Sequence, residues 1–161
     1  MTWKEVRAIP SEPDKLRSYL EERIARRLTA DPDPGYDVAE VTAYTLVQAC
    51  KDIISRLPAS PEARASAYRI LASLPGIQAE GEMTDPLGRR GQALSYQEEI
   101  EPDLFTQVRL VVDPSTGLLL AEVRTNTTKL ANGRQAELRV STSYQAIGWT
   151  DERPQLPTHR D

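Results

Sequence analysis

Two adjacent arginines flanked by glycines are the first residues in this sequence whose types and spacing could do chemistry. Residues 84–91 read T-D-P-L-G-R-R-G. Arg89 and Arg90 could present two guanidinium groups to a carboxylate or phosphate, and the glycines could add free backbone N–H groups. The stretch lacks the G-x-x-x-x-G-K-S/T spacing of a phosphate-binding loop and does not open a helix. We therefore favour a solvated hairpin corner and keep an anion-binding site at Arg89 and Arg90 as the alternative.

The side chains that most often serve as nucleophiles, bases and metal ligands are scarce. The only histidine, His159, lies in a proline-containing C-terminal tail, where little can orient it as a general base. The only cysteine, Cys50, excludes an internal disulfide and a thiolate metal cluster. Cys50 falls on the apolar stripe of a predicted helix, which favours a buried core thiol over a nucleophile. We therefore expect no catalytic residue, no metal site and no cofactor, and a protein that is not an enzyme.

Carboxylates form the remaining polar cluster. Glu98, Glu99, Glu101 and Asp103 lie close together before a predicted strand. Such oxygens can bind a hard cation such as Ca²⁺, but the run lacks the Asp-x-Asn-x-Asp-Gly pattern and contains Pro102. We favour a solvated loop. Paired carboxylates that meet only in space remain the one enzymatic alternative.

Apolar side chains near the end of the chain offer a different kind of site. A curved antiparallel sheet covered by helices on one side can leave an apolar groove, which four residues could line: Leu138, Val140, Tyr144 and Trp149. Because protein interiors are normally filled, packing of these side chains into the core is the favoured alternative. The parity of the apolar residues changes after Tyr144, which predicts a bulge or bend near Ala146.

The first half of the chain has the apolar spacing of helices. Capping residues and prolines predict helix starts at Ser11-Glu12-Pro13, Asp37 and Ser60-Pro61. The prolines and glycine of residues 31–35 end the first helix, and Pro75-Gly76 end the third.

After Gly76 the apolar period changes from about 3.6 residues to 2, as expected for half-buried strands. Five strands are predicted around residues 77–83, 94–96, 108–112, 119–123 and 136–144. Turn signals at residues 84–88, 113–117 and 131–134 indicate hairpins, and hence antiparallel pairing. We predict an α+β fold in which three N-terminal helices are followed by a five-stranded antiparallel twisted sheet, with the helices packed on one face.

The length of 161 residues suits a single domain over residues 1–161, with a helical part (1–75), a sheet (76–150) and an extended tail (151–161). The net charge of −4 provides no basic field for phosphates, so nucleic acid is not expected as a partner. No apolar run approaches the ~18 to 20 residues that span a bilayer, and the chain as given is expected to be soluble.

Several motifs resemble the C-terminal ectodomain of a family of uncharacterised actinobacterial membrane-anchored proteins. They are S-P-E-A-R-A-S-A-Y-R-I-L-A-S-L-P-G-I (60–77), T-D-P-L-G-R-R-G (84–91), D-P-S-T-G-L-L (113–119), W-K-E-V (3–6) and I-P-S-E-P-D-K-L (9–16). The resemblance covers most of the chain. It implies a fragment of a longer protein with one membrane-spanning helix, a location on the extracytoplasmic face of the cell membrane, and frequent proximity to extracytoplasmic-function sigma factors.

A shorter resemblance concerns the later strands. The D-P-S-T-G-L-L-L turn, the G-R turn and the long closing strand are similar to the sheet of half-barrel periplasmic proteins that carry or sense lipoproteins. This similarity implies lipid or lipopeptide binding only by analogy of fold.

Two functions follow as expectations. The leading one is a non-enzymatic extracytoplasmic ligand-binding or sensory module of a membrane-anchored, sigma-factor-linked regulator. Its partners would be a lipid, a lipopeptide, another protein or the N-terminal part of the parent chain. The alternative is a protein-interaction or scaffolding domain without a small-molecule site.

Overall fold

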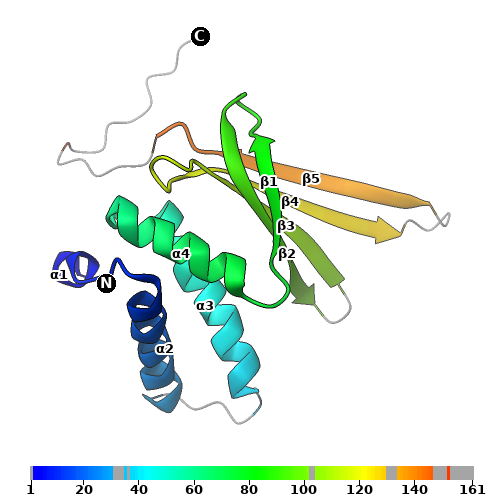
Figure 1. Ribbon diagram of the computed structural model, residues 1–161. Helices are drawn as coiled ribbons and strands as arrows, with labels where there is room; N and C mark the ends of the chain where they lie inside the picture. Colours follow the sequence, from blue (N-terminus) through cyan, green and yellow to red (C-terminus); the bar gives the residue numbers. More distant parts are fainter. Residues whose placement is uncertain are drawn as a thin grey trace.

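The computed structural model describes residues 2–30, 35, 37–101, 104–129, 134–146 and 152. In these residues a group of helices precedes a group of strands (Figure 1). The helices are α1 (Trp3–Arg7), α2 (Pro13–Ala30), α3 (Val38–Ser55) and α4 (Pro61–Ser73). The strands are β1 (Gln78–Thr84), β2 (Arg90–Glu101), β3 (Leu104–Val112), β4 (Leu119–Lys129) and β5 (Gln135–Ser143). No helix in the described part of the chain is both long and apolar enough to cross a membrane.

The two later helices begin where the sequence predicts. A carboxylate oxygen of Asp37 accepts a hydrogen bond from the backbone N–H of Ala39 at 2.7 Å, which satisfies a donor at the start of α3. Ser60 caps α4 in the same way by accepting from the N–H of Ala63 at 3.1 Å. Pro61 occupies the first turn of α4, where its missing N–H costs nothing.

The helix α1 is an addition to the three predicted helices. Thr2 Oγ1 accepts from the backbone N–H of Glu5 at 3.3 Å, and Glu5 Oε2 accepts from the N–H of Thr2 at 2.5 Å. This reciprocal pair is a capping box, and its T-x-x-E signature is readable in residues 2–5. Val6 of this short helix is buried in the core.

The sheet is an antiparallel meander in the order β1-β2-β3-β4-β5. The predicted hairpin turns at residues 84–88 and 113–117 join β1 to β2 and β3 to β4. In the second turn Asp113 accepts from the N–H of Ser115 at 2.8 Å, and Gly117 takes a φ of +68° that a side chain would disfavour. The predicted turn at Asn132-Gly133 lies outside the described residues.

The helices cover one face of this sheet (Figure 1), which confirms the predicted α+β architecture. The main core lies between the two layers, where the helical stripes meet apolar residues that alternate along the strands: Leu94, Tyr96, Val108, Leu110 and Val112. A smaller cluster of Ala93, Val111 and Ala121 is buried on the opposite parity.

Cys50 lies at the centre of the main core, with no exposed surface. Burial raises the pKa of its thiol to about 12, so the reactive thiolate is almost absent at neutral pH. We expect a thiol reagent to leave the native protein unlabelled and to label one site per chain after denaturation. Cys50→Ala should lower the free energy of unfolding by about 1 kcal/mol, because the small sulfur leaves a small void. Rapid labelling of the native protein would contradict this prediction.

Candidate ligand-binding cavity

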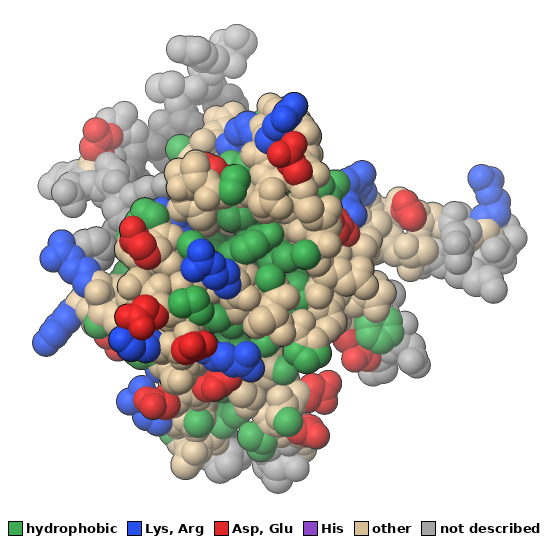
Figure 2. Space-filling model, in the orientation of Figure 1, with side chains coloured by type: hydrophobic (Ala, Val, Ile, Leu, Met, Phe, Trp, Pro, Cys, Tyr) green, Lys and Arg blue, Asp and Glu red, His purple; other side chains and the backbone are tan. Residues whose placement is uncertain are grey.

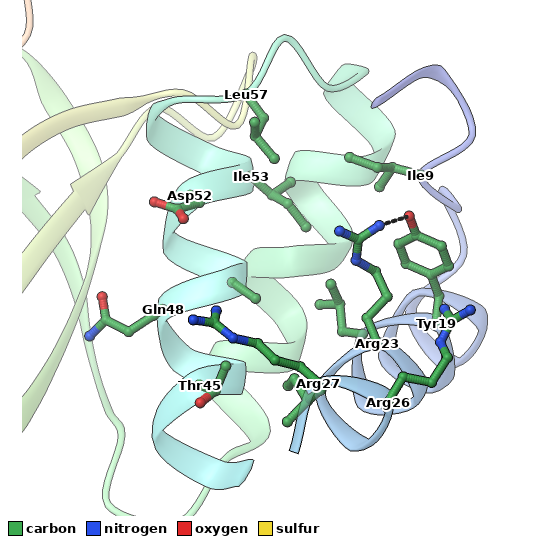
Figure 3. Close-up of a pocket in the computed structure, with 13 residues that line it drawn as sticks. Ile9, Tyr19, Arg23, Arg26, Arg27, Thr45, Gln48, Asp52, Ile53 and Leu57 are labelled. Carbon is green, nitrogen blue, oxygen red and sulfur yellow. Dashed lines mark hydrogen bonds between the residues drawn. The ribbon is translucent and has the colours of Figure 1, made fainter. Parts of the chain in front are cut away.

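A cavity of about 540 Å³ lies between α2 and α3. This volume is within the range of about 300 to 1,000 Å³ typical of small-molecule sites. Figure 3 shows the residues that line it, which come from α2, α3 and the segments next to them. They are Ile9, Tyr19, Leu20, Arg23, Ile24, Arg26, Arg27, Thr45, Gln48, Ala49, Asp52, Ile53 and Leu57.

The floor of the cavity is apolar. Ile24 on α2 and Ile53 on α3 are both buried. Between them α3 presents Thr45 and Ala49, which are one helical turn apart and therefore share a face. These two side chains are short, so the helices can pack through their neighbours while a space remains above Thr45 and Ala49.

The rim of the cavity is cationic. Three arginines of α2 line it, namely Arg23, Arg26 and Arg27. The only carboxylate among the lining residues is Asp52, which pairs with Arg56 at 3.3 Å. Positive charge therefore exceeds negative charge around an apolar floor, an arrangement suited to an anion that carries an apolar group.

The three arginines differ in how far they are already engaged. Arg23 lies beside the Tyr19 ring, with 5.8 Å from Cζ to the ring centroid, and donates to the Tyr19 hydroxyl at 3.4 Å and to the Glu5 carboxylate at 3.5 Å. Arg26 Nε donates to the carbonyl of Glu22 at 3.4 Å. Arg27 has no hydrogen bond or ion pair with any described residue. In Figure 3 its guanidinium reaches across the cavity toward α3, so Arg27 is the group best placed to receive an outside anion.

Sequence reasoning did not predict this cavity. Arg23, Arg26 and Arg27 lie within five residues of one another in the sequence, but an arginine-rich stretch of a helix usually forms a solvated face. The cavity depends on which turn of α3 lies opposite this stretch. A pair of small residues at helical spacing, here Thr45 and Ala49, is the one local signal that could have suggested a gap.

Arg89 and Arg90 occupy the hairpin corner between β1 and β2. The Arg89 guanidinium donates to Asp85 Oδ2 through Nε at 2.8 Å and Nη2 at 2.6 Å, and also to the carbonyl of Leu120. Its donors are thus directed inward. Arg90 is exposed and lies 3.5 Å from Glu82. Neither side chain lines the α2–α3 cavity.

The four residues proposed for an apolar groove do not share one environment. Leu138 and Val140 on β5 are 61% and 51% exposed. Tyr144 is half-buried against the main core. Trp149 and the other apolar residues after Ala146 lie outside the described residues. The predicted tail also lies outside them, except for Glu152.

Neither a family model, nor a curated protein, nor a solved structure matches this chain. The surface adds one general observation: Figure 2 shows acidic and basic side chains intermingled over the helical side of this view, without a large field of either sign.

A chain of charged residues connects α3 to the sheet. Lys51 Nζ lies 2.9 Å from Glu122, which also receives Arg124 Nε at 2.8 Å. Arg124 in turn pairs with Glu98 at 2.8 Å, and Gln48 donates to Glu98 at 3.1 Å. Two cations thus balance two carboxylates.

The pKa of Glu122 follows from its contacts. Burial alone would raise the pKa of Glu122, but the hydrogen bonds from Lys51 and Arg124 outweigh burial and hold its pKa below the usual value. The predicted solvated loop at the acidic cluster is wrong, because Glu98, Glu99 and Glu101 lie in β2, and Glu98 belongs to this ion-pair network. In the described part of the chain no group of three or more His, Cys, Asp or Glu side chains could hold a metal ion.

Proposed function

We propose that this protein is a non-catalytic ligand-binding module and that the cavity between α2 and α3 is its binding site. The observation that carries the proposal is the position of Arg27, a cation without a partner among the described residues, above an apolar floor that includes Ile24 and Ile53. Burial of the ligand's apolar group against the floor would remove that group from water and so favour binding. The anionic head of the ligand would accept a charge-assisted hydrogen bond from Arg27. The ligand class is an anionic amphiphile, such as a medium-chain fatty acid or a lipopeptide whose peptide part carries a carboxylate.

The cellular setting is part of the same proposal. The motifs of residues 60–77 and 84–91 resemble the extracytoplasmic domain of membrane-anchored actinobacterial proteins that often occur beside sigma factors. In that setting, binding of an amphiphile outside the membrane would be a sensory event rather than a chemical conversion. We infer a sensory role in a membrane-anchored regulator from this resemblance.

The direct test is titration of the protein with decanoate, with the heat of binding measured by isothermal titration calorimetry. We expect Arg27→Ala to weaken binding about tenfold, which corresponds to about 1.4 kcal/mol for one charge-assisted hydrogen bond. Ala49→Leu should weaken binding by filling the floor. The matched control is Arg69→Ala, because Arg69 is also an exposed helical arginine without a described partner but lies on α4, away from the cavity.

A second ligand separates the contributions of the charge and the chain. Decanol has the same chain without the carboxylate, so it should bind the wild type more weakly than decanoate does. The two ligands should bind Arg27→Ala with equal affinity. Absence of decanoate binding, or equal losses in Arg27→Ala and Arg69→Ala, would refute the assignment of this cavity.

A further inference from the structure

The strand β5 forms an edge of the sheet. It pairs with β4 in one unbroken register, from Ala121 opposite Ser143 to Lys129 opposite Gln135. No described strand pairs with its other side. Natural edge strands are usually short, or carry charged side chains (especially lysine), proline or a bulge that disfavours pairing with another chain. The nine residues of β5 include no lysine or proline, and their register has no bulge.

The backbone groups of β5 that face outward can be identified. The N–H of Tyr144 donates to the carbonyl of Leu120 on β4 at 2.9 Å, and this pair continues the register of the ladder. In an antiparallel ladder, residues alternate between bonding to one neighbour and facing the other side. The even-numbered residues of β5 therefore bond to β4, and the odd-numbered Glu137, Arg139 and Ser141 direct their N–H and C=O groups to the free edge.

Four side chains of β5 are exposed and lack a partner among the described residues. Leu138 and Val140 point to the face that carries the helices, but β4 and β5 reach beyond the helical layer (Figure 1), and both side chains are more than half exposed. Glu137 and Arg139 are exposed on the opposite face and have no ion pair or hydrogen bond with any described residue.

We propose that β5 pairs with β5 of a second copy of this chain, antiparallel about a two-fold axis that passes between the two Leu138 residues. In this register Glu137 faces Arg139 of the second copy, and the symmetry repeats this pair on the other side of the axis. Leu138 then faces Leu138 of the copy, and Val140 faces Ala136. The strand is thus self-complementary in charge and in apolar contact, as an interface with two-fold symmetry requires.

Neighbouring registers lack this complementarity. An axis between the two Glu137 residues would place their carboxylates opposite each other. An axis between the two Arg139 residues would place their guanidinium groups opposite each other. Like charges directly opposite are destabilising in a sheet. The charge pattern therefore selects the register through Leu138, with the outward backbone groups of Glu137 and Arg139 forming the new hydrogen bonds.

Charge reversal tests this proposal in solution. Glu137→Arg leaves two cations on the strand, and Arg139→Glu leaves two carboxylates. We expect sedimentation equilibrium to show a wild-type dimer and to show that each single variant dissociates at least ten times more readily. An equimolar mixture of the two variants should associate again, as should the double variant Glu137→Arg/Arg139→Glu, because both restore opposite charges across the axis.

A cross-link tests the register separately. Leu138→Cys should form a disulfide-linked dimer under mild oxidation, since the two positions face each other, whereas Thr142→Cys should not, because its counterpart in the copy is Arg134. The buried Cys50 does not compete. Any one of three results would overturn the proposal. The wild type could sediment as a monomer at every concentration, the single variants could associate as the wild type does, or the two positions could cross-link equally. Decanoate binding is measured independently of these results.

Discussion

Asp85→Ala is expected to lower the free energy of unfolding by about 3 kcal/mol, one of the largest effects of any single polar substitution in this chain. The Asp85 side chain is fully buried. Besides the Arg89 guanidinium, it accepts from the backbone N–H groups of Leu87 at 2.9 Å and Arg89 at 2.8 Å. Removal of this carboxylate leaves a cation and two N–H groups without their acceptor. Urea denaturation at neutral pH would measure the loss.

The turn between β3 and β4 supplies a matched control. Asp113 is also followed by proline and also accepts from a backbone N–H two residues later, but no cation of the described residues pairs with it and its side chain is partly exposed. Asp113→Ala should therefore cost only about 1 kcal/mol. Equal losses in the two variants would show that burial and the Arg89 ion pair contribute nothing beyond the local turn.

The pH dependence provides a second measurement at Asp85. Burial raises the pKa of Asp85, but the hydrogen bonds from Arg89 and Leu87 outweigh burial, so the pKa lies below its usual value. A depressed pKa stabilises the folded state above the unfolded pKa of about 3.9, and that contribution is lost as the pH falls through the folded pKa. The difference in stability between wild type and Asp85→Ala should narrow below about pH 4.

Lys51→Met is expected to cost about 2 kcal/mol, because it removes one of the two cations that neutralise the largely buried Glu122. Loss of every partner of a buried charge would cost more, but Arg124 remains 2.8 Å from Glu122. Methionine retains most of the apolar stem of lysine, so the measured loss reports the charge rather than a void.

An exposed ion pair is the control for this substitution. Lys15 lies 2.9 Å from Glu12, the same distance that separates Lys51 from Glu122, but both side chains are largely exposed. Lys15→Met should change stability by less than about 0.5 kcal/mol. Adding Glu122→Gln to Lys51→Met should recover part of the loss, since it removes the under-compensated charge. A loss in Lys51→Met no greater than that in Lys15→Met would contradict the prediction.

The elements that the sequence predicted depend on short-range interactions. Ser60-Pro61 begins α4, and Asp113 with Gly117 closes the β3–β4 turn, because each signal acts within about four residues of itself. Apolar periodicity also predicted the burial of Cys50, since one helical stripe must face the core. The change of period after Gly76 separated helices from strands and so determined the α+β class. The capping box at Thr2 and Glu5 had the same local character, although the single turn of α1 was not predicted.

Tertiary structure alone decided which of these elements meet and which polar groups become partners. Lys51 and Glu122 are far apart in the sequence, and they form an ion pair only because α3 lies across β4. Arg27 and Thr45 line one cavity only because α2 and α3 pack so that the turn of α3 with Thr45 lies opposite the arginines of α2. β5 is an edge of the described sheet because the meander of described strands ends there. Local sequence determines the shape and apolar face of each element, whereas crossing angles and register arise from packing of all elements together, a long-range effect that no single segment encodes.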